Sequence, residues 1–498
     1  MNKFYFFIFV AIVSIANIAD ANATIWRVNN NPGKSGTFEV IPGEVVIVFS
    51  NLTDALRSSD VQAGDTLHIE GSTIPYGKNN GSATSFDVDT VRKRLVIIGP
   101  GYLLSENAET QHNKESAKIY SLFISSAATG TVIAGLEQMP SNLSPTQLGG
   151  TPINGVVYAV NPFYDEAVAG SYLTANSYAG VNSQGTLAAA QAMCWNQPNK
   201  YKILVNADNV TITHCKLYYL ELYNDRALQN ITITKCFFNP GIIACRADDK
   251  PVTNLIISNS FFRNDGKCAY SGLNDATTNA TVGVYGQVRA TSFMAIDLRG
   301  KINSVGAVAN EDMYVYYNRY SWPVVTPTIQ NNTFYNSFNI SVKSARLSNN
   351  LFFPKQVPVS EANARLCYGL PVWAGTAEHT TSNNIIFNLS VWPTPSASVN
   401  YGGMYNNDSY SNIAETSWFT SSTTLPALDK SFIIGNSSPA RSSDGVETKQ
   451  RGMYGGLSPY ALSGLYTIPA VWEITIPSYP SGEVPSTGFE VRVRVRSH

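Results

Sequence analysis

Apolar and polar positions alternate over short β-branched runs, and one such run returns almost unchanged. Residues 209–215 read NVTITHC, and about 21 residues further on the chain reads NITITKC. In each copy a strand is predicted, with Val210 and Ile212 facing one way and Thr211 and Thr213 facing the other. One strand of this length cannot bury its apolar face alone. The period therefore predicts coils that lie directly on top of one another.

Each strand is followed by a bend whose residue types recur. The recurring six-residue template reads aliphatic-x-Asn-x-x-aromatic or aliphatic, and its first copy is Ile212 to Leu217. Its third place is mostly Asn, which tolerates the left-handed backbone of a sharp bend. The fourth place then points inward, where it can hydrogen-bond to the copies above and below and avoid an unpaired buried group. The sixth place supplies an apolar stack. In chain order, the bend column is His214, Lys235, Asn259, Asn331, Asn349 and Asn383, the inner column is Cys215, Cys236, Ser260, Asn332, Asn350 and Asn384, and the apolar column is Leu217, Phe238, Phe262, Phe334, Phe352 and Ile386.

Further strands and one helix are predicted around these coils. Residues 65–70, 94–98, 202–205 and 432–434 read as additional strands of the same stack. Residues 50–57 predict a short amphipathic helix that Ser50 or Asn51 can cap, with Leu52, Ala55 and Leu56 as its apolar stripe. Because the open end of a stack exposes unpaired backbone, this helix is predicted to cover it.

The two ends of the chain differ from the coils. Residues 1–23 combine a lysine, an apolar run and Ala-Asn-Ala, which predicts a secretory signal peptide; the alternative is an uncleaved membrane anchor. No later stretch is apolar enough to cross a membrane. Residues 468–474 and 489–496 read as strands, the second alternating Val with Arg. They predict a hairpin over the end or side of the stack, or else a sorting or attachment signal.

Two long segments interrupt the period, at about 137–200 and about 268–327. Insertions in stacked repeats gather on one side, which is often the binding side. The second insertion carries exposed-type aromatic residues that could stack on sugar rings, and the alternative is that they pack onto the flank of the coils. These candidate binding residues are Tyr314, Tyr316, Tyr317 and Trp322.

Charge and cysteine content argue against two classes of function, nucleic-acid binding and zinc or redox chemistry. The formal net charge is −1 and only 14% of the residues are charged, which argues against a nucleic-acid partner. The six cysteines form no C-x-x-C pair, so a zinc or redox motif is not indicated. Cys215 and Cys236 fall at equivalent places in consecutive copies, where either a disulfide or a column of buried thiols fits; we favour the thiols.

Several motifs carry a resemblance to a known group. Residues 24–32 (TIWRVNNNP), 63–67 (AGDTL) and 93–101 (KRLVIIGPG) resemble the start of secreted bacterial right-handed parallel β-helix proteins with a pectin-lyase-like fold. Residues 438–445 (SPARSSDG) and 452–460 (GMYGGLSPY) resemble the closing coil of that group. The group includes lyases, hydrolases, adhesins and tailspikes, so the resemblance implies a fold and no single activity.

The expected architecture is therefore all-β, a right-handed parallel β-helix (solenoid) with an N-terminal capping helix and a C-terminal β extension. We expect a signal peptide at 1–23, an N-terminal cap at 24–62, the parallel β-helix with its two insertions at 63–460, and the C-terminal β extension at 461–498.

One dense group of charged residues is a candidate catalytic site. A lyase needs carboxylates that bind calcium and a basic residue that removes a proton, and a glycosidase needs two facing carboxylates. Ordinary turn residues between coils are the alternative explanation. The five histidines are scattered, so no metal site is predicted. The candidates are Asp225, Arg226, Arg246, Asp248, Asp249, Lys250, Arg263 and Asp265.

These observations lead to one functional expectation and two alternatives. We expect a secreted or cell-surface bacterial protein that engages polysaccharide or a cell-surface glycan through its flank and insertions, and the sequence does not demonstrate catalysis. The alternatives are a polysaccharide lyase or glycosidase, and a structural or adhesive surface protein. No cofactor is expected, except Ca²⁺ in the case of a lyase.

Overall fold

The computed structural model describes twenty-three segments of the chain. These are residues 23–41, 44–77, 88–107, 110, 113–139, 152–153, 156–157, 201–238, 241–245, 250–263, 294–298, 321–335, 339–342, 344–353, 380–382, 385–387, 408–410, 429–436, 438, 440–441, 450–466, 470–475 and 492–496. The predicted signal peptide lies outside them, apart from its last residue.

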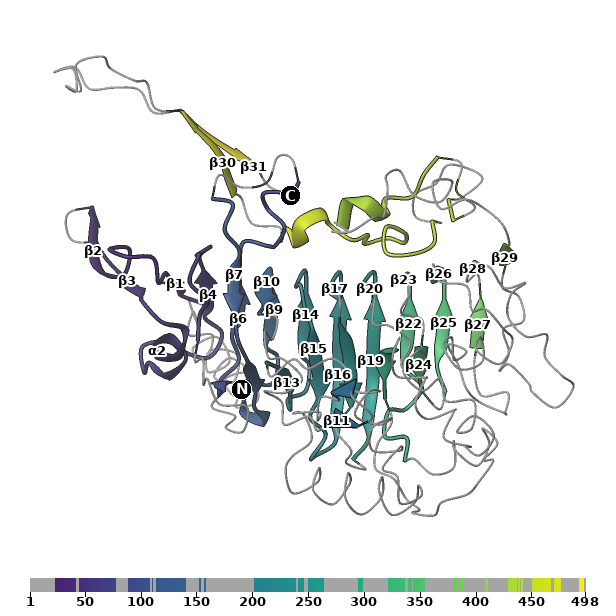
Figure 1. Ribbon diagram of the computed structural model, residues 1–498. Coiled ribbons are helices and arrows are strands. Elements are labelled where there is room, and N and C mark those ends of the chain that lie inside the picture. Colours follow the sequence, from purple (N-terminus) through teal and green to yellow (C-terminus); the bar gives the residue numbers. More distant parts are fainter. Residues whose placement is uncertain are drawn as a thin grey trace, which may run out of the picture.

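Within these segments the protein is predominantly β, with three long sheets of mainly parallel strands and almost no helix (Figure 1). We call the sheets A, B and C. Sheet A has twelve strands, and only its first pair, β2 (Gly36–Ile41) and β3 (Glu44–Phe49), is antiparallel. The other strands, in spatial order, are β1 (Ile25–Val28), β4 (Thr66–Ile69), β6 (Val96–Ile98), β9 (Val132–Ala134), β14 (Thr211–Thr213), β16 (Leu228–Thr234), β19 (Val252–Ser258), β22 (Thr328–Gln330), β25 (Arg346–Ser348) and β27 (Thr380–Ser382).

Sheets B and C are built of shorter strands. Sheet B contains β17 (Phe237–Phe238), β20 (Phe261–Arg263), β23 (Thr333–Tyr335), β26 (Leu351–Phe353), β28 (Ile385–Phe387) and β29 (Asp408–Tyr410). Bridges at Lys216 join it to the pair β7 (Ala117–Ile119) and β10 (Leu136–Gln138). Sheet C contains β5 (Asp89–Val91), β8 (Leu122–Ile124), β13 (Ile203–Val205), β15 (Tyr219–Leu222), β18 (Ile242–Cys245), β21 (Met294–Asp297) and β24 (Asn339–Ser341).

Successive strands visit the three sheets in turn. The chain passes through β16, β17 and β18 and then through β19, β20 and β21, and each strand pairs in parallel with its counterpart from the preceding passage. We call one such passage a coil. The pairing is in register, so that Ile212, Ile233, Ile257, Ile329 and Leu347 form one buried row. The predicted contact between equivalent residues of consecutive coils is therefore confirmed for these strands.

The bend predicted after each strand of sheet A is confirmed by the backbone. Five of the six bend residues have a left-handed φ: 55° at His214, 53° at Lys235, 47° at Asn259, 53° at Asn331 and 54° at Asn349. Side chains with a Cβ rarely adopt this conformation, and Asn adopts it most readily among them. The sixth, Asn383, lies outside the described residues.

The inner column forms the predicted hydrogen-bonded ladder. The backbone N–H of Cys236 donates to Ser260 Oγ at 3.1 Å, and that of Ser260 donates to Asn332 Oδ1 at 3.0 Å. Asn332 in turn donates to Asn350 Oδ1. These four side chains are fully buried, so the ladder satisfies polar groups that cannot reach water.

The first two members of the inner column are free, buried thiols. Their coils are adjacent, since the N–H of Phe237 donates to the carbonyl of Cys215 at 2.8 Å. Burial raises the pKa of the Cys236 thiol well above its ordinary value, which keeps it protonated and unreactive. The interpretation as a thiol column is confirmed.

Beside the ladder, the apolar column stacks its aromatic rings. The rings of Phe238 and Phe262 are 4.8 Å apart and 7° from parallel, and those of Phe262 and Phe334 are 5.0 Å apart and 10° from parallel. Leu217 continues this buried stack in the preceding coil. Such offset-stacked rings contribute about 0.5 to 1.5 kcal/mol each beyond the area they bury.

The predicted helix is present as α2 (Leu52–Arg57). The side chain of Asn51 accepts from the N–H of Thr53 at 2.9 Å, which selects Asn51 from the two expected caps. Leu52, Ala55 and Leu56 face the main core. Figure 1 shows the helix at the N-terminal end of the stack.

The predicted strand at 432–434 is wrong. Phe432 ends a 3-10 helix, η7 (Asp429–Phe432), and its ring packs on Phe261 at 4.2 Å and on Tyr335 at 5.1 Å, on the outer side of sheet B. An apolar run packs against the outside of a sheet as readily as against its interior, and the pattern of residues does not distinguish the two.

Residues 450–466, which contain the motif that resembles a closing coil, cross the outside of sheet B. The N–H of Gly452 donates to the carbonyl of Asn349 at 2.8 Å. Two coils earlier in the same bend column, Asn259 Nδ2 donates to the carbonyl of Gly455 at 2.6 Å. At the other end the N–H of Tyr102 donates to the carbonyl of Ser463 at 2.8 Å. The chain thus runs back along the stack, above the row of sheet B strands in Figure 1.

The buried side chain of Asp429 holds residues 450–466 in place through hydrogen bonds. Asp429 accepts hydrogen bonds from Asn107 Nδ2 (2.9 Å), the N–H of Lys430 (2.8 Å), Tyr460 Oη (3.1 Å) and the N–H of Ser463 (2.6 Å). Burial raises the pKa of Asp429 above its ordinary value, although these donors favour the charged form. The carboxyl group therefore joins residue 107 to the C-terminal segment.

Two antiparallel strand pairs and two further 3-10 helices lie outside the three sheets. The predicted C-terminal hairpin is present: β30 (Ala470–Thr475) pairs antiparallel with β31 (Arg492–Arg496). A second antiparallel pair is β11 (Pro152–Ile153) with β12 (Val156–Val157), and η1 (Ser126–Ala128) and η9 (Leu462–Gly464) are 3-10 helices. In the described part of the chain, no helix is both long enough and apolar enough to span a membrane.

Candidate functional site

The expected charged cluster is only partly brought together. Asp225 and Arg226 lie at the bend from sheet C to sheet A, and Asp225 is exposed. Arg226 forms an ion pair with Asp208 of the preceding coil at 2.9 Å, and its Nε donates to the carbonyl of Asn206. Lys250 is exposed at the same bend one coil later. Arg246, Asp248, Asp249 and Asp265 lie outside the described residues.

Arg263 lies elsewhere. It ends strand β20 of sheet B, is 2% exposed, and stands over the ring of Tyr335 with 5.2 Å between guanidinium carbon and ring centroid. This position belongs to the bend from sheet B to sheet C and not to the bend that holds Asp225. Arg226 and Arg263 therefore lie at different bends of the coils.

A second asparagine column runs along the bend from sheet C to sheet A. Asn209, Asn230 and Asn254 each stand two residues before an outward-facing position of sheet A, and all three are exposed with φ of 56°, 58° and 54°. Asn230 Nδ2 donates to Asn209 Oδ1 at 2.8 Å, and Asn254 Nδ2 donates to Asn230 Oδ1 at 2.9 Å. In the next two coils the hydroxyls of Thr326 and Ser344 hydrogen-bond at 3.0 Å in the same column. We call these five residues the outer ladder.

The outer ladder borders an uncharged strip of sheet A. Thr211, Thr232, Ile256 and Thr328 each follow a ladder residue by two positions and point outward, and Val96 and Val132 extend this row in register, so that it crosses six strands. They are spaced by about 4.8 Å, the distance between neighbouring strands. Beyond Thr328 the next residue of the row is the exposed Arg346, and beyond Val96 it is the uncharged Thr66. The strip consists of Val96, Val132, Thr211, Thr232, Ile256 and Thr328, which are partly buried or exposed.

Sheet B and the adjoining pair of strands carry a short row of largely buried charges on their outer side. Glu137 pairs with Lys216 at 2.7 Å and accepts from Ser116 Oγ at 2.5 Å, and Lys118 is its neighbour in the sheet. Burial opposes the charged form of Glu137, but Lys216 and Ser116 outweigh burial and lower the pKa of Glu137. The same contact raises the pKa of Lys216 against the effect of burial. Both groups are therefore charged at neutral pH.

Metal-binding groups are not assembled within the described segments, where no three His, Cys, Asp or Glu side chains form a cluster. His68 and His214 stand in different coils. Burial, together with the positive charge of Lys235, lowers the pKa of His214 to about 3, so this imidazole is neutral. His112, His379 and His498 lie outside the described residues.

Of the aromatic candidates, only Trp322 falls within the described residues. It is partly buried just before Val324, which bridges to Val252 at the start of β19. Tyr314, Tyr316 and Tyr317 lie outside the described part, so their contact with sugars stays a prediction.

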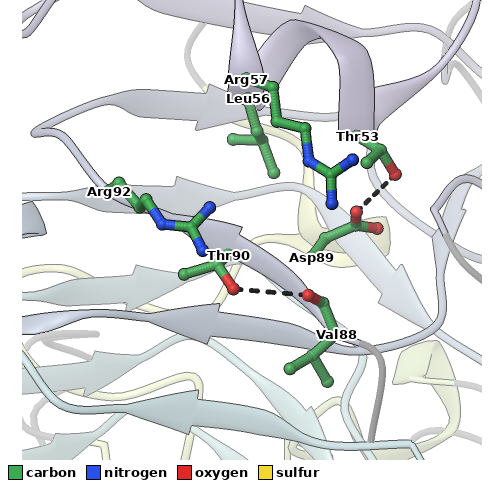
Figure 2. A pocket seen from close by; sticks show the side chains of 7 residues that line it. All are labelled: Thr53, Leu56, Arg57, Val88, Asp89, Thr90 and Arg92. Atoms are coloured by element: carbon green, nitrogen blue, oxygen red, sulfur yellow. Dashed lines mark hydrogen bonds between the residues drawn. The ribbon is translucent and has the colours of Figure 1, made fainter.

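A polar cavity of about 220 Å³ opens between α2 and β5 (Figure 2). Asp89 is 3% exposed and accepts from Thr53 Oγ1 at 2.5 Å. Figure 2 shows the guanidinium of Arg57 directed toward this carboxylate and that of Arg92 farther away, beside Thr90, whose hydroxyl is directed to the carbonyl of Val88 at 3.4 Å. Neither guanidinium has a hydrogen-bond or ion-pair partner among the described residues.

Sequence reasoning missed both the outer ladder and the cavity. The signal for the ladder was the first letter of the repeated phrase itself, Asn209 and Asn230, which precedes Thr-Ile-Thr in both copies. The cavity left only a weak signal, the basic run at 92–94, because Arg57 joins it through tertiary packing alone.

Comparison of the chain with protein-family models, with curated proteins and with solved structures gives no match.

Proposed function

We propose that the protein is a secreted or cell-surface right-handed parallel β-helix that binds polysaccharide without catalysing its cleavage. The strand order A, B, C, A supports the helix, and the right-handed sense follows the general preference of parallel crossover connections. The buried face of α2 at the N-terminal end supports its role as a cap. The apolar start of the sequence supports export.

The outer ladder and its strip are the observation that carries the binding proposal. They present amides, hydroxyls and β-branched side chains at a spacing of about 4.8 Å over several coils. A polysaccharide is itself a regular row of hydroxyls and C–H faces, so a long, uncharged, repeating surface complements it. Amides and hydroxyls can exchange hydrogen bonds with sugar hydroxyls without the desolvation cost of a charge.

Binding is tested with soluble neutral and acidic polysaccharides in affinity electrophoresis. Asn230→Asp and Asn254→Asp introduce charge and remove the donors to Asn209 and Asn230, while Asp still tolerates the left-handed backbone. Asn436→Asp is the matched control, because this Asn is also exposed and lies shortly after η7, outside sheet A. We expect retardation by a neutral glycan, lost in the first two variants and kept in the control. Equal retardation of all four proteins would contradict the proposed surface.

Turnover separates this proposal from the enzyme alternative. The same glycans are incubated with the protein, with and without calcium, and new chain ends are counted. We expect none. Chain cleavage that disappears in Asp225→Asn would replace the binding proposal with a lyase or glycosidase at the bend that holds Asp225 and Arg226.

A further inference from the structure

We propose that the cavity between α2 and β5 binds a small hydroxylated oxyanion, such as one sugar unit that carries a carboxylate or a phosphate. The oxyanion lies between Arg57 and Arg92, and a neighbouring hydroxyl of the ligand donates to Asp89. The cavity lies on different elements from the outer ladder, so this inference stands independently of the proposed function.

The two arginines supply the oxyanion contacts. They come from separate elements, Arg57 from the last turn of α2 and Arg92 from the residue after β5, and both line the same cavity. A guanidinium offers a planar fork of N–H donors that matches a carboxylate or a phosphate, and it is always charged. The guanidinium groups of Arg57 and Arg92 have no partner among the described residues, so they are available to an anion from solution.

Asp89 determines which second group the ligand carries beside its oxyanion. Its carboxylate sits in the cavity wall, is almost fully buried, and already accepts the Thr53 hydroxyl. A bare anion that filled the cavity would meet this negative charge, whereas a ligand with a hydroxyl beside its oxyanion can donate to it. The pattern of two cations and one carboxylate therefore favours a hydroxy acid or sugar phosphate over a simple anion.

The dimensions of the cavity limit the ligand. A volume of about 220 Å³ is below the range of about 300 to 1,000 Å³ of sites that hold drug-sized molecules. The lining is almost entirely polar, with Leu56 and Val88 as its apolar residues, which suits a hydroxylated ligand. One monosaccharide unit, free or at the end of a chain, satisfies these limits.

The test is isothermal titration calorimetry of the full chain with four probes: glucuronate, glucose 6-phosphate, glucose and inorganic phosphate. We expect at least one of the two hydroxylated anions to bind saturably, and to bind at least about tenfold more tightly than glucose or inorganic phosphate. Which of the two binds better distinguishes a carboxylate from a phosphate ligand. Equal binding of glucose, or equal binding of inorganic phosphate, overturns the proposal.

Variants assign the contacts. Arg57→Gln and Arg92→Gln should each weaken binding by about tenfold or more, since each removes a charge-assisted contact. Arg94→Gln is the control, because it removes the same charge from an exposed arginine of the same basic run that does not line the cavity. Arg94→Gln should change affinity less than about twofold. An equal loss in all three variants means general charge attraction and overturns the assignment.

Asp89→Asn tests the hydroxyl contact. Because Asp89 is buried, its variant is first compared with the wild type by thermal unfolding, and Thr53→Val is measured beside it as a variant that removes only the internal hydrogen bond. We expect Asp89→Asn to reduce the preference for glucose 6-phosphate over inorganic phosphate, while Thr53→Val keeps it. An unchanged preference in Asp89→Asn, measured on folded protein, overturns the role of Asp89.

Discussion

Asn332 and Asn350 occupy equivalent places in consecutive coils, and Asn332 donates twice to the same acceptor. Its backbone N–H and its Nδ2 reach Asn350 Oδ1 at 3.0 and 3.1 Å. The Nδ2 groups of Asn332 and Asn350 also donate to the carbonyls of Ile257 and Ile329, each in a preceding coil. The ladder thus holds neighbouring coils in register through side chains, in addition to the strand pairing.

Replacing Asn332 should be costly. Asn332→Ala leaves the buried N–H of Ser260 without its side-chain acceptor and removes the Nδ2 bonds to Asn350 Oδ1 and to the carbonyl of Ile257, so we expect a loss of about 3 kcal/mol in the free energy of unfolding. Urea denaturation followed by circular dichroism measures this loss. The exposed Gln229→Ala should change it by less than about 0.5 kcal/mol. Similar effects of the two substitutions would show that the ladder does not stabilise the stack.

The bend at Lys235 predicts a stabilising substitution. Lys235 has φ of 53°, a conformation that costs a residue with a Cβ about 1 to 2 kcal/mol. Lys235→Gly relieves this strain but loses more backbone entropy on folding, so we expect a net gain of about 0.5 to 1 kcal/mol in the same urea assay. Lys34→Gly, at an exposed position without a left-handed φ, should give no gain. A loss at Lys235 that matches the loss at Lys34 would contradict the left-handed bend.

The ion pair between Glu137 and Lys216 predicts that part of the free energy of unfolding is lost in acid. The pKa of Glu137 is lowered from 4.5, so its contribution is present above pH 4.5 and is lost as the pH falls through the lower folded value. At pH 7 we expect Glu137→Gln to destabilise the protein by about 2 kcal/mol, because Lys216 is left unpaired. The difference in the free energy of unfolding between the wild type and Glu137→Gln should become smaller as the pH falls towards 3.

Glu115→Gln is the control for this pair, since Glu115 is more exposed and lies 3.8 Å from Lys118. Its effect on the urea midpoint should be small at every pH. If the difference between wild type and Glu137→Gln stays constant from pH 7 to pH 3, Glu137 is not held charged by Lys216.

The contribution of Asp429 to stability should change with pH in the opposite direction to that of Glu137. Burial raises its pKa above 3.8, so its contribution to stability is complete below pH 3.8 and is lost as the pH rises through the folded value. The free energy of unfolding of the wild type, minus that of Asp429→Asn, should therefore fall as the pH rises from 3 towards 8. Limited proteolysis of the 450–466 segment reports the same change locally. A difference that grows with pH would mean that the four donors outweigh burial.

The periodic features of the fold could be read from the sequence because each depends on a local rule. The left-handed bend at Asn259 and Asn331 follows from residue type, and the inward turn of Ser260 and Asn332 follows from the bend. The Asn51 cap likewise depends on residues within one helical turn.

Features that depend on distant parts of the chain were not readable. Phe432 was expected in a strand of the stack, yet it packs from outside on Phe261, about 170 residues away in the sequence. The cavity needs Arg57 and Arg92 to meet across α2 and β5. The outer ladder was visible as a repeated Asn, but its hydrogen bonds follow only once Asn209 and Asn230 are known to be neighbours.

The contact between equivalent residues of consecutive coils is the central claim, and a pair of cysteines measures it directly. Thr211→Cys combined with Thr232→Cys places thiols at paired positions of sheet A, about 4.8 Å apart at Cα, within the range of a disulfide. Thr211→Cys combined with Ile256→Cys spans two coils, beyond the limit of about 7 Å. After mild oxidation, mass spectrometry should find the first disulfide and not the second. Absence of the first, or equal formation of both, would contradict the stacking of the coils.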